Sequence, residues 1–262
     1  MREIWVGVRW YRAGRSLWSR LRIWRHGTLR WLCYDPVKVV QFHGIASGLA
    51  MVFDLDGVVI DSMPMHTQAW ISYLKGLGLR ATPDLVERMH GRRNDDIVTD
   101  FIATDLGAEE IFAHGAAKER LFREMMAPEL ERHLVPGIRE LLGGLNGTPA
   151  GLASNAEPAN IDLVLDGAGL RGRFRAVVSG QEVRRPKPHP DIYLRAAELL
   201  GVRAENCIVF EDSPVGVSAG LSAGARVVGV ETHPGELPGV ALRIRDFLDP
   251  ALGPWLEGLR PC

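Results

Sequence analysis

The feature that most constrains the fold is an apolar run, Leu49–Phe53, that ends abruptly in two carboxylates one residue apart, Asp54 and Asp56. The run is short and the chain turns at Gly57, a pattern typical of a strand buried in a parallel sheet. Ligands of open α/β sheets bind outside the carboxyl ends of the strands, where Asp54 and Asp56 fall. Residues i and i+2 of an extended chain point the same way, so the two carboxylates would repel each other unless a proton or a cation intervenes. Mg²⁺ meets that need, although Asp and Gly are also common in solvated turns.

A second apolar run, Cys207–Phe210, ends in the same manner, in Glu211 and Asp212. Between the two acidic endings, a short strand is predicted over Ala150–Ala153, with Ser154 at its carboxyl end. By itself, a Ser at this point is equally well explained as the N-cap of the next helix.

Lys187 stands between Pro186 and Pro188, which restrict the backbone and would hold the ammonium in one direction. A fixed cation near two carboxylates and a phosphate supplies the charge neutralisation that phosphoryl transfer needs. Without such neighbours, the lysine is an ordinary loop residue.

The alternation of strands and helices after residue 135 predicts right-handed βαβ units and a Rossmann-like parallel sheet in an α/β fold. The chain of 262 residues is long enough for one such core with a small inserted subdomain. The predicted strands are Leu49–Phe53, Ala150–Ala153, Ala176–Ser179, Cys207–Phe210, Arg226–Val230 and a last stretch through Val240–Ile244.

Residues 64–134 read as helical, and some seventy helical residues are too many for a simple crossover between two strands. We therefore expect three parts: a helical domain over 64–134, a core domain formed by 49–63 and 135–262, and a segment 1–48 outside both. The expected helices of the inserted domain are Met65–Leu77, Leu85–Met89, Asp95–Leu106, Glu109–Met126 and Glu129–His133.

The most informative loop of the inserted domain contains Gly91, Arg92 and Arg93. Gly91 permits an unusual turn, and two adjacent guanidiniums could contact a phosphorylated substrate. A solvated helix start with Asn94 as N-cap is an equal alternative. By position alone, His66, near Asp61, is well explained as a surface histidine.

Residues 1–48 differ in composition from the rest of the chain. They hold five of the seven tryptophans and nine Lys or Arg against two acids, a net charge of +7, so the remainder carries −8. Arg/Trp interleaving could bind nucleic acid or form an interfacial membrane helix. We favour an extension outside the fold, because the segment has no clear helical or strand period.

Cysteine usage and hydropathy point to the cytoplasm. Cys33, Cys207 and Cys262 are too few and too scattered for a disulfide framework or a zinc site, so we expect no disulfides. No apolar stretch approaches the roughly eighteen residues that a membrane span needs, and no signal peptide is evident.

Taken in order, the motifs Asp54-Leu55-Asp56-Gly57-Val58, Ser154, Lys187-Pro188-His189-Pro190-Asp191-Ile192-Tyr193 and Glu211-Asp212 resemble those of the haloacid dehalogenase superfamily. The resemblance runs from about Leu49 to Asp249. It implies a sheet core with a helical cap that closes over the active site. Chains of that family usually begin near Met51, in keeping with residues 1–48 as an extension.

The resemblance also implies roles. Asp54 would attack phosphorus to form an aspartyl-phosphate, and Asp56 would act as acid and then base. Mg²⁺ would be held by Asp54, the backbone carbonyl of Asp56, and Asp212, with Glu211 as a ligand or a partner of the ligands. The phosphate would be held by Ser154, Asn155 and Lys187, and the substrate by His66 and the loop of Gly91, Arg92 and Arg93.

The residues also discriminate among related activities. Dehalogenases of the superfamily lack an acid at the position of Asp56, so dehalogenation is not expected. β-Phosphoglucomutases carry a Lys and an Arg where this chain has Glu157 and Asn94, and both differences remove cations that would grip a second phosphate. We therefore predict a phosphatase acting on a small phosphorylated metabolite, in preference to a phosphosugar isomerase. An idle scaffold that binds a partner is a third alternative, opposed by the intact set of charged residues.

Overall fold

The computed structural model describes residues 5–12, 15–22, 45–82 and 94–262. It divides into two units, Met1–Val40 and Gln41–Cys262. In the first, β1 (Trp5–Arg12) and β2 (Arg15–Arg22) pair antiparallel, with Trp5 opposite Arg22. This hairpin was not expected, because its residues do not alternate between apolar and polar.

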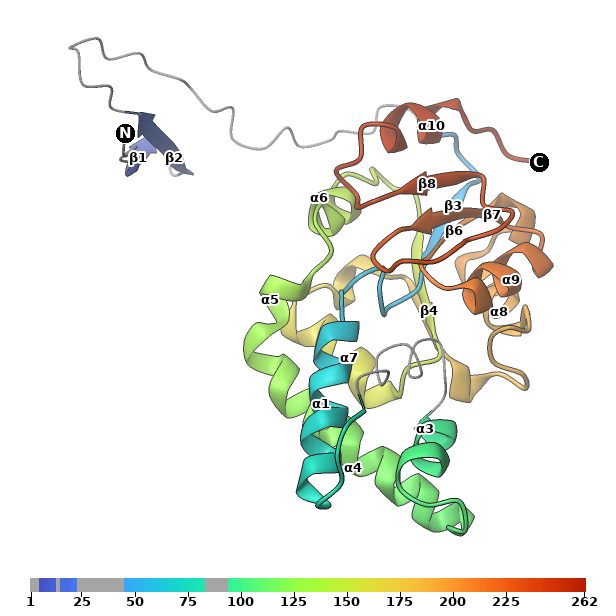
Figure 1. Ribbon diagram of the computed structural model, residues 1–262. Coiled ribbons are helices and arrows are strands. Elements are labelled where there is room, and N and C mark those ends of the chain that lie inside the picture. Colours follow the sequence, from blue (N-terminus) through green and yellow to red (C-terminus); the bar gives the residue numbers. More distant parts are fainter. Residues whose placement is uncertain (1–4, 13–14, 23–44, 83–93) are drawn as a thin grey trace. The chain divides into compact units, whose positions relative to one another are not determined.

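The second unit is built on a six-stranded parallel sheet of order β5-β4-β3-β6-β7-β8 (Figure 1). This confirms the predicted α/β fold. The central strand β3 is buried along its whole length and pairs with β4 and β6, so its carboxyl end is flanked by theirs. The strands are β3 (Ala50–Phe53), β4 (Ala150–Ser154), β5 (Ala176–Ser179), β6 (Cys207–Glu211), β7 (Arg226–Val230) and β8 (Leu242–Ile244).

Two different cores cover the two faces of the sheet because side chains alternate along each strand. Ala50 and Val52 of β3 pack with helices α8 (Asp191–Leu200) and α9 (Pro214–Ser222). Phe53 joins a second, aromatic cluster, in which it stacks on Phe210 at a centroid distance of 4.7 Å and lies 6.0 Å from both Phe174 and Phe247. The other helices of this part are α6 (Ile138–Gly143), α7 (Pro158–Gly167), α10 (Leu252–Gly258) and the short 3-10 turns Arg171–Arg173, Gly180–Glu182 and Ala204–Asn206.

The described elements between β3 and β4 are helices, as predicted, and Figure 1 shows α1, α3 and α4 as a bundle at one end of the unit. Both α1 and α3 pack on α4. The described helices are α1 (Met63–Gly76), α3 (Asn94–Phe101), α4 (Ala108–Met126), the 3-10 turn Ala127–Glu129 and α5 (Leu130–His133). The helix expected over Leu85–Met89 lies outside the described residues.

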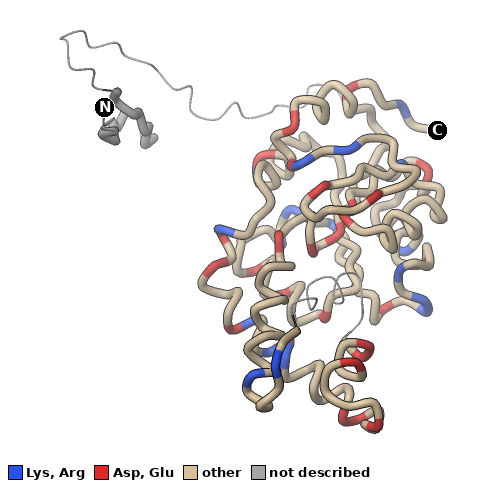
Figure 2. The backbone as a smooth tube through the Cα atoms, in the orientation of Figure 1, with Lys and Arg blue, Asp and Glu red and all other residues tan. Residues whose placement is uncertain are grey.

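Charged residues of both signs are interspersed along residues 45–262, while α3 is conspicuously acidic (Figure 2). Asp95 and Asp96 lie in the first turn of α3. Carboxylates there favour helix formation because they meet the positive end of the helix dipole. Among the described residues, no helix is long and apolar enough to cross a membrane.

The first prediction concerns the aromatic cluster. Replacement Phe53→Ala should lower the free energy of unfolding by about 3–5 kcal/mol, because it leaves a cavity among three fully or nearly buried rings. Urea denaturation measures the loss. Phe112→Ala is the matched control: Phe112 is 70% exposed, and its truncation should change stability by no more than about 0.5 kcal/mol. Equal effects of the two changes would contradict the packing described.

Candidate active site

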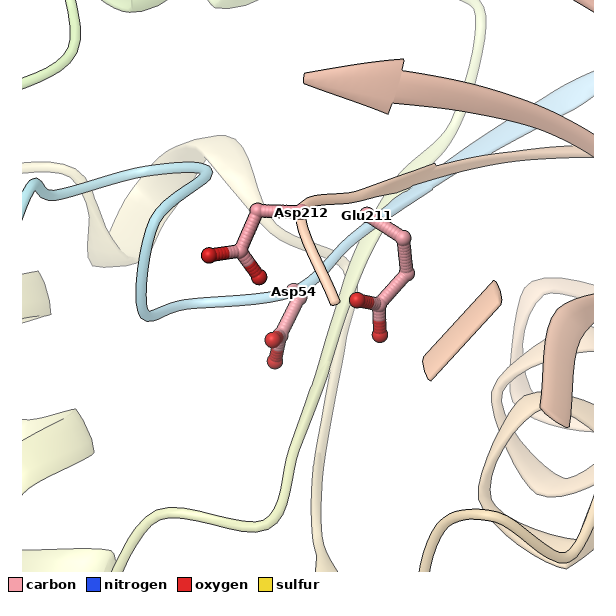
Figure 3. A group of neighbouring side chains, drawn as sticks. All are labelled: Asp54, Glu211 and Asp212. Carbon is pink, nitrogen blue, oxygen red and sulfur yellow. The ribbon is translucent and has the colours of Figure 1, made fainter. Parts of the chain in front are cut away.

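The register of β3 and β6 brings the two acidic strand endings together. Phe53 pairs with Phe210, and the amide of Asp54 donates to the carbonyl of Phe210 at 3.1 Å. Asp54 is therefore beside Glu211 and Asp212, and one carboxylate oxygen of each lies within 4.8 Å of the others. Figure 3 shows the three side chains projecting from neighbouring strand ends into one region.

Glycine at position 57 is required by this arrangement. Gly57 has a φ of +70°, and a Cβ built on it would lie 1.8 Å from Asp212 Oδ2. The turn after Asp56 can therefore pass close to the Asp212 carboxylate only without a side chain. The carbonyl of Gly57 accepts a hydrogen bond from Thr232 Oγ1 at 2.8 Å, which holds the turn against the loop after β7.

Lys187 is the cation that faces the acidic cluster. Its Nζ lies 2.8 Å from Asp54 Oδ1 and 2.7 Å from Glu211 Oε1. Burial alone would lower the pKa of Lys187, but Asp54 and Glu211 outweigh it and raise that pKa, so the ammonium stays charged. The Asn155 side chain accepts from the Lys187 amide at 3.3 Å and donates to its carbonyl at 3.4 Å, which ties the lysine's loop to the end of β4.

Glu211 is fully buried and its oxygens are already occupied. Besides Lys187, Oε1 accepts from the Tyr193 hydroxyl at 2.5 Å, and Oε2 accepts from Ser213 Oγ at 3.2 Å and Ser213 N at 3.4 Å. A Cβ on Gly216 would lie 1.8 Å from the same carboxylate. Glu211 is thus better placed to hold Lys187 than to bind a metal, whereas Asp54 and Asp212 have fewer protein partners.

The electrostatics of Asp54 and Asp212 fit a bound cation. Burial raises the pKa of Asp54 to about 7, with Lys187 opposing and Glu211 adding to the shift. Burial and the charges of Glu211 and Asp54 raise the pKa of Asp212 well above its usual value. Asp54 Oδ1, although close to Lys187, has no aligned hydrogen-bond donor among the described residues. Crowded, buried carboxylate oxygens of this kind suit Mg²⁺.

Ser154 ends β4, the strand on the other side of β3, and is 1% exposed. Its Oγ accepts from the amide of Ala156 at 3.1 Å. Leu152 pairs with Phe53, so Ser154 lies at the same sheet edge as Asp54. The structure thus brings Asp54, Ser154, Asn155 and Asp212 to adjoining strand ends, and Lys187 Nζ reaches Asp54 from the loop between β5 and α8.

Comparison with known proteins assigns this geometry to a family. The model of the haloacid dehalogenase-like hydrolases matches residues 49–224. The chain belongs to this family. It is 34% identical to hexitol phosphatase A of Escherichia coli over 71% of this chain and 84% of that protein. It is 30% identical to a fructose-1-phosphate phosphatase of the same organism, over 69% and 95%, and 32% identical to a β-phosphoglucomutase of Bacillus subtilis, over 69% and 82%.

Solved structures of the family agree with the fold. A family IA hydrolase from Entamoeba histolytica superposes with a TM-score of 0.72 at 26% identity, covering 80% of this chain and all of that one. A β-phosphoglucomutase from Clostridium difficile gives 0.67 at 25% identity, covering 79% and 96%.

In this hydrolase, Asp56 does not join the three-carboxylate cluster through its side chain. Its Oδ1 accepts from Ser62 Oγ at 2.6 Å and lies 3.9 Å from His66 Nε2. Burial favours protonation of Asp56, but His66 and Ser62 outweigh it and lower the pKa of Asp56. His66, predicted to lie near the substrate, thus lies beside Asp56. Gly91, Arg92 and Arg93, predicted with it, lie outside the described residues.

Lys118 was not among the predicted site residues, yet its Nζ donates to His66 Nδ1 at 2.7 Å. An ammonium group can only donate, so Nδ1 is the acceptor in this contact, and Nε2 is the ring nitrogen that faces Asp56. The ring also stacks on Phe122 at a centroid distance of 3.8 Å.

Glu119, also missed, lies beside Lys118 in α4 and both are buried, 4% and 2% exposed. A signal was present: the buried positions of α4 are Gly115, Lys118, Glu119, Phe122 and Met126, so two charged residues interrupt an otherwise apolar helical stripe. A further missed contact is His233 Nε2, 3.7 Å from Asp212 Oδ2.

The second prediction uses the pKa of Glu119. Burial acts to raise it, but the charge of the adjacent Lys118 and the hydrogen bonds from Lys118 and Asn94 lower it to about 2, from a usual value of 4.5. A depressed folded-state pKa stabilises the fold above the unfolded value, and the stabilisation is lost as the pH falls from 4.5 toward 2. The free energy of unfolding of the wild type should therefore exceed that of Glu119→Gln by about 3 kcal/mol above pH 5, and this difference should shrink on acidification.

Urea melts of both proteins between pH 2 and 6 measure that gap. Burial lowers the pKa of Lys118, and the charge of the adjacent Glu119 opposes that shift. A gap that stays constant down to pH 2 would show that Glu119 is not ionised in the folded protein.

Proposed function

We propose that this chain is a Mg²⁺-dependent phosphatase that hydrolyses a small phosphorylated metabolite, most simply a sugar or sugar-alcohol phosphate, through an aspartyl-phosphate. The observation that carries the proposal is the convergence of Asp54, Asp212 and the buried ammonium of Lys187 at adjoining ends of β3 and β6. The named phosphatases among the relatives act on phosphorylated sugars or sugar alcohols, which supports that substrate class.

In the first step, a carboxylate oxygen of Asp54 attacks phosphorus and the bond to the leaving oxygen breaks, while Asp56 gives that oxygen its proton. The negative charge of a bound phosphate favours the protonated form of nearby Asp56. In the second step, Asp56 takes a proton from water, whose oxygen attacks phosphorus and releases inorganic phosphate and free Asp54.

Asp54, Asp212 and the backbone carbonyl of Asp56 would hold Mg²⁺, which when bound offsets the repulsion between the carboxylates and the phosphate. Lys187 supplies a second positive charge that is fixed by Glu211 and Asn155. Ser154, with Asn155 and Lys187, would hold the oxygens of the transferring phosphoryl group.

We propose residues 64–134 as a cap over a core formed by 49–63 and 135–262, with 1–48 as an extension. In the described part of this cap, His66 Nε2 lies 3.9 Å from Asp56 Oδ1, which supports a role for His66 near the reacting groups. Gly91, Arg92 and Arg93 are proposed to contact the substrate. We further propose that the enzyme works in the cytoplasm.

Hydrolysis is favoured over phosphosugar isomerisation by two engaged side chains. Glu157 pairs with Arg123 at 3.2 Å, and Asn94 donates to Glu119 at 2.8 Å. Both therefore have protein partners at the positions where a mutase would present cations. The β-phosphoglucomutase among the relatives keeps isomerisation as the second candidate.

The third prediction tests the proposal by ³¹P NMR. With Mg²⁺, a panel of fructose 1-phosphate, sorbitol 6-phosphate, glycerol 1-phosphate and β-glucose 1-phosphate should yield inorganic phosphate. Asp54→Asn should lower the rate roughly 10³-fold or more, because an amide cannot take the place of the nucleophile. Asp162→Asn, at an exposed surface pair, is the control and should retain activity. Unimpaired turnover by Asp54→Asn would overturn the mechanism.

The fourth prediction separates the two reactions. With β-glucose 1-phosphate and a trace of glucose 1,6-bisphosphate, we expect either inorganic phosphate or no reaction, and no glucose 6-phosphate. Accumulation of glucose 6-phosphate without free phosphate would establish the isomerase and overturn our interpretation of Glu157 and Asn94.

Removal of Mg²⁺ by EDTA should abolish turnover, and the return of Mg²⁺ should restore it.

A further inference from the structure

Glu119 is the centre of a buried polar cluster that the proposed chemistry does not use. Its Oε1 accepts from Lys118 Nζ at 2.7 Å and from Asn94 Nδ2 at 2.8 Å, and its Oε2 accepts from Asn160 Nδ2 at 2.8 Å. A carboxylate that is 4% exposed is costly to bury unless such donors compensate it. The donors come from α3, α4 and α7, so one side chain joins three helices.

Toward the catalytic side, the cluster continues from Lys118 to His66 and on to Asp56. Lys118 lies between Glu119 and His66 Nδ1, at 2.7 Å from each. Without Glu119, this ammonium would be buried with no adjacent countercharge and would move or lose its proton. His66 would then lose the donor that keeps its Nε2 turned toward Asp56.

Toward the core, the cluster is anchored on α7, which follows β4 and Ser154. Asn160 is 4% exposed and uses both ends of its amide: Nδ2 donates to Glu119, and Oδ1 accepts from Arg123 Nη1 at 2.8 Å. Arg123 also pairs with Glu157 just before α7. Helix α4 and helix α7 thus share a buried contact at Glu119, and Glu119 is adjacent in sequence to Lys118, the lysine that contacts His66.

We propose that Glu119 is a positioning residue: it locks α4 to α7 through Asn160 and, in that state, holds Lys118 and His66 so that Asp56 delivers its proton to the leaving oxygen. This inference rests on the proposed function, because Glu119 acts through Asp56. It assigns the link between the inserted helices and the acid–base group to one buried carboxylate.

The fifth prediction is a leaving-group test. Steady-state kcat/KM reports on the steps up to the first irreversible one, here the transfer of phosphoryl to Asp54. An alkyl phosphate needs its leaving oxygen protonated, whereas p-nitrophenyl phosphate releases a stable phenolate and needs little help. The alkyl substrate is the member of the ³¹P NMR panel that wild type turns over fastest.

Glu119→Gln keeps the shape but loses the charge and turns one acceptor into a donor. Its kcat/KM should fall about tenfold or more on the alkyl phosphate and less than about threefold on p-nitrophenyl phosphate. Asn160→Ala, which removes the core-side donor to Glu119 together with the acceptor for Arg123, should show the same selective loss in weaker form. Asp162→Asn, two residues further along α7 and exposed, is the matched control and should match wild type.

If Glu119→Gln does not fold, the double variant Lys118→Met/Glu119→Gln removes both buried charges and should give the same selective loss. Asp56→Asn is run in parallel as the reference for a lost acid. If Asp56→Asn is selective for the alkyl phosphate while the Glu119 variants lose nothing, or lose equally on both substrates, the positioning role is wrong and the proposed function stands. If Asp56→Asn is not selective, the acid role of Asp56 is wrong and the inference fails with it.

Discussion

The repulsion among the carboxylates of Asp54, Glu211 and Asp212 is the constraint on which the rest of the active site depends. The parallel pairing of β3 and β6 forces these groups together, since Phe53 and Phe210 are in register and each strand ends in an acid. Burial excludes the water that would otherwise screen them. The surroundings therefore have to supply positive charge: burial and the neighbouring carboxylates raise the pKa values of Asp54 and Asp212, and Lys187 opposes both shifts.

Glu211 shows how the fold divides these acids between two tasks. Lys187, Tyr193 and Ser213 occupy its oxygens, so it holds the lysine in place and has little left to offer a metal. Asp54 Oδ1, by contrast, has no aligned hydrogen-bond donor among the described residues. Glu211 and Asp54 carry the same charge and are both buried. They differ in role because the number of hydrogen-bond donors around each carboxylate differs.

Much of this site could be predicted from the sequence because its determinants are local. A short apolar strand that ends in Asp or Glu places that residue at the carboxyl edge of a parallel sheet whatever its neighbours are. The helical insertion was equally readable, because α1 and α4 carry helical periods over long stretches. The β1–β2 hairpin was not predicted, since its residues lack the alternation that identifies a strand.

Lys118 and Glu119 could not be assigned from the sequence because their roles depend on contacts across long separations. Glu119 meets Asn160 from 41 residues away, and Lys118 meets His66 from 52 residues away. A Lys–Glu pair in an amphipathic helix is usually solvated, so only the apolar positions around it hinted at burial.

The contacts of Glu119 with Lys118 and Asn160 also give a physical reason for charges in a buried interface between helices. A buried ion pair adds little net stability compared with apolar residues of the same volume, because desolvation offsets the attraction. It does, however, penalise arrangements in which its partners separate. In this enzyme, separating α4 from α7 would take Asn160 away from Glu119. The Glu119 carboxylate, next to Lys118, would then be exposed to solvent or left buried with a donor missing. If Glu119 has the proposed positioning role, the docking of α4 on α7 and the alignment of His66 with Asp56 are physically linked, since both require Glu119 to keep all of its donors.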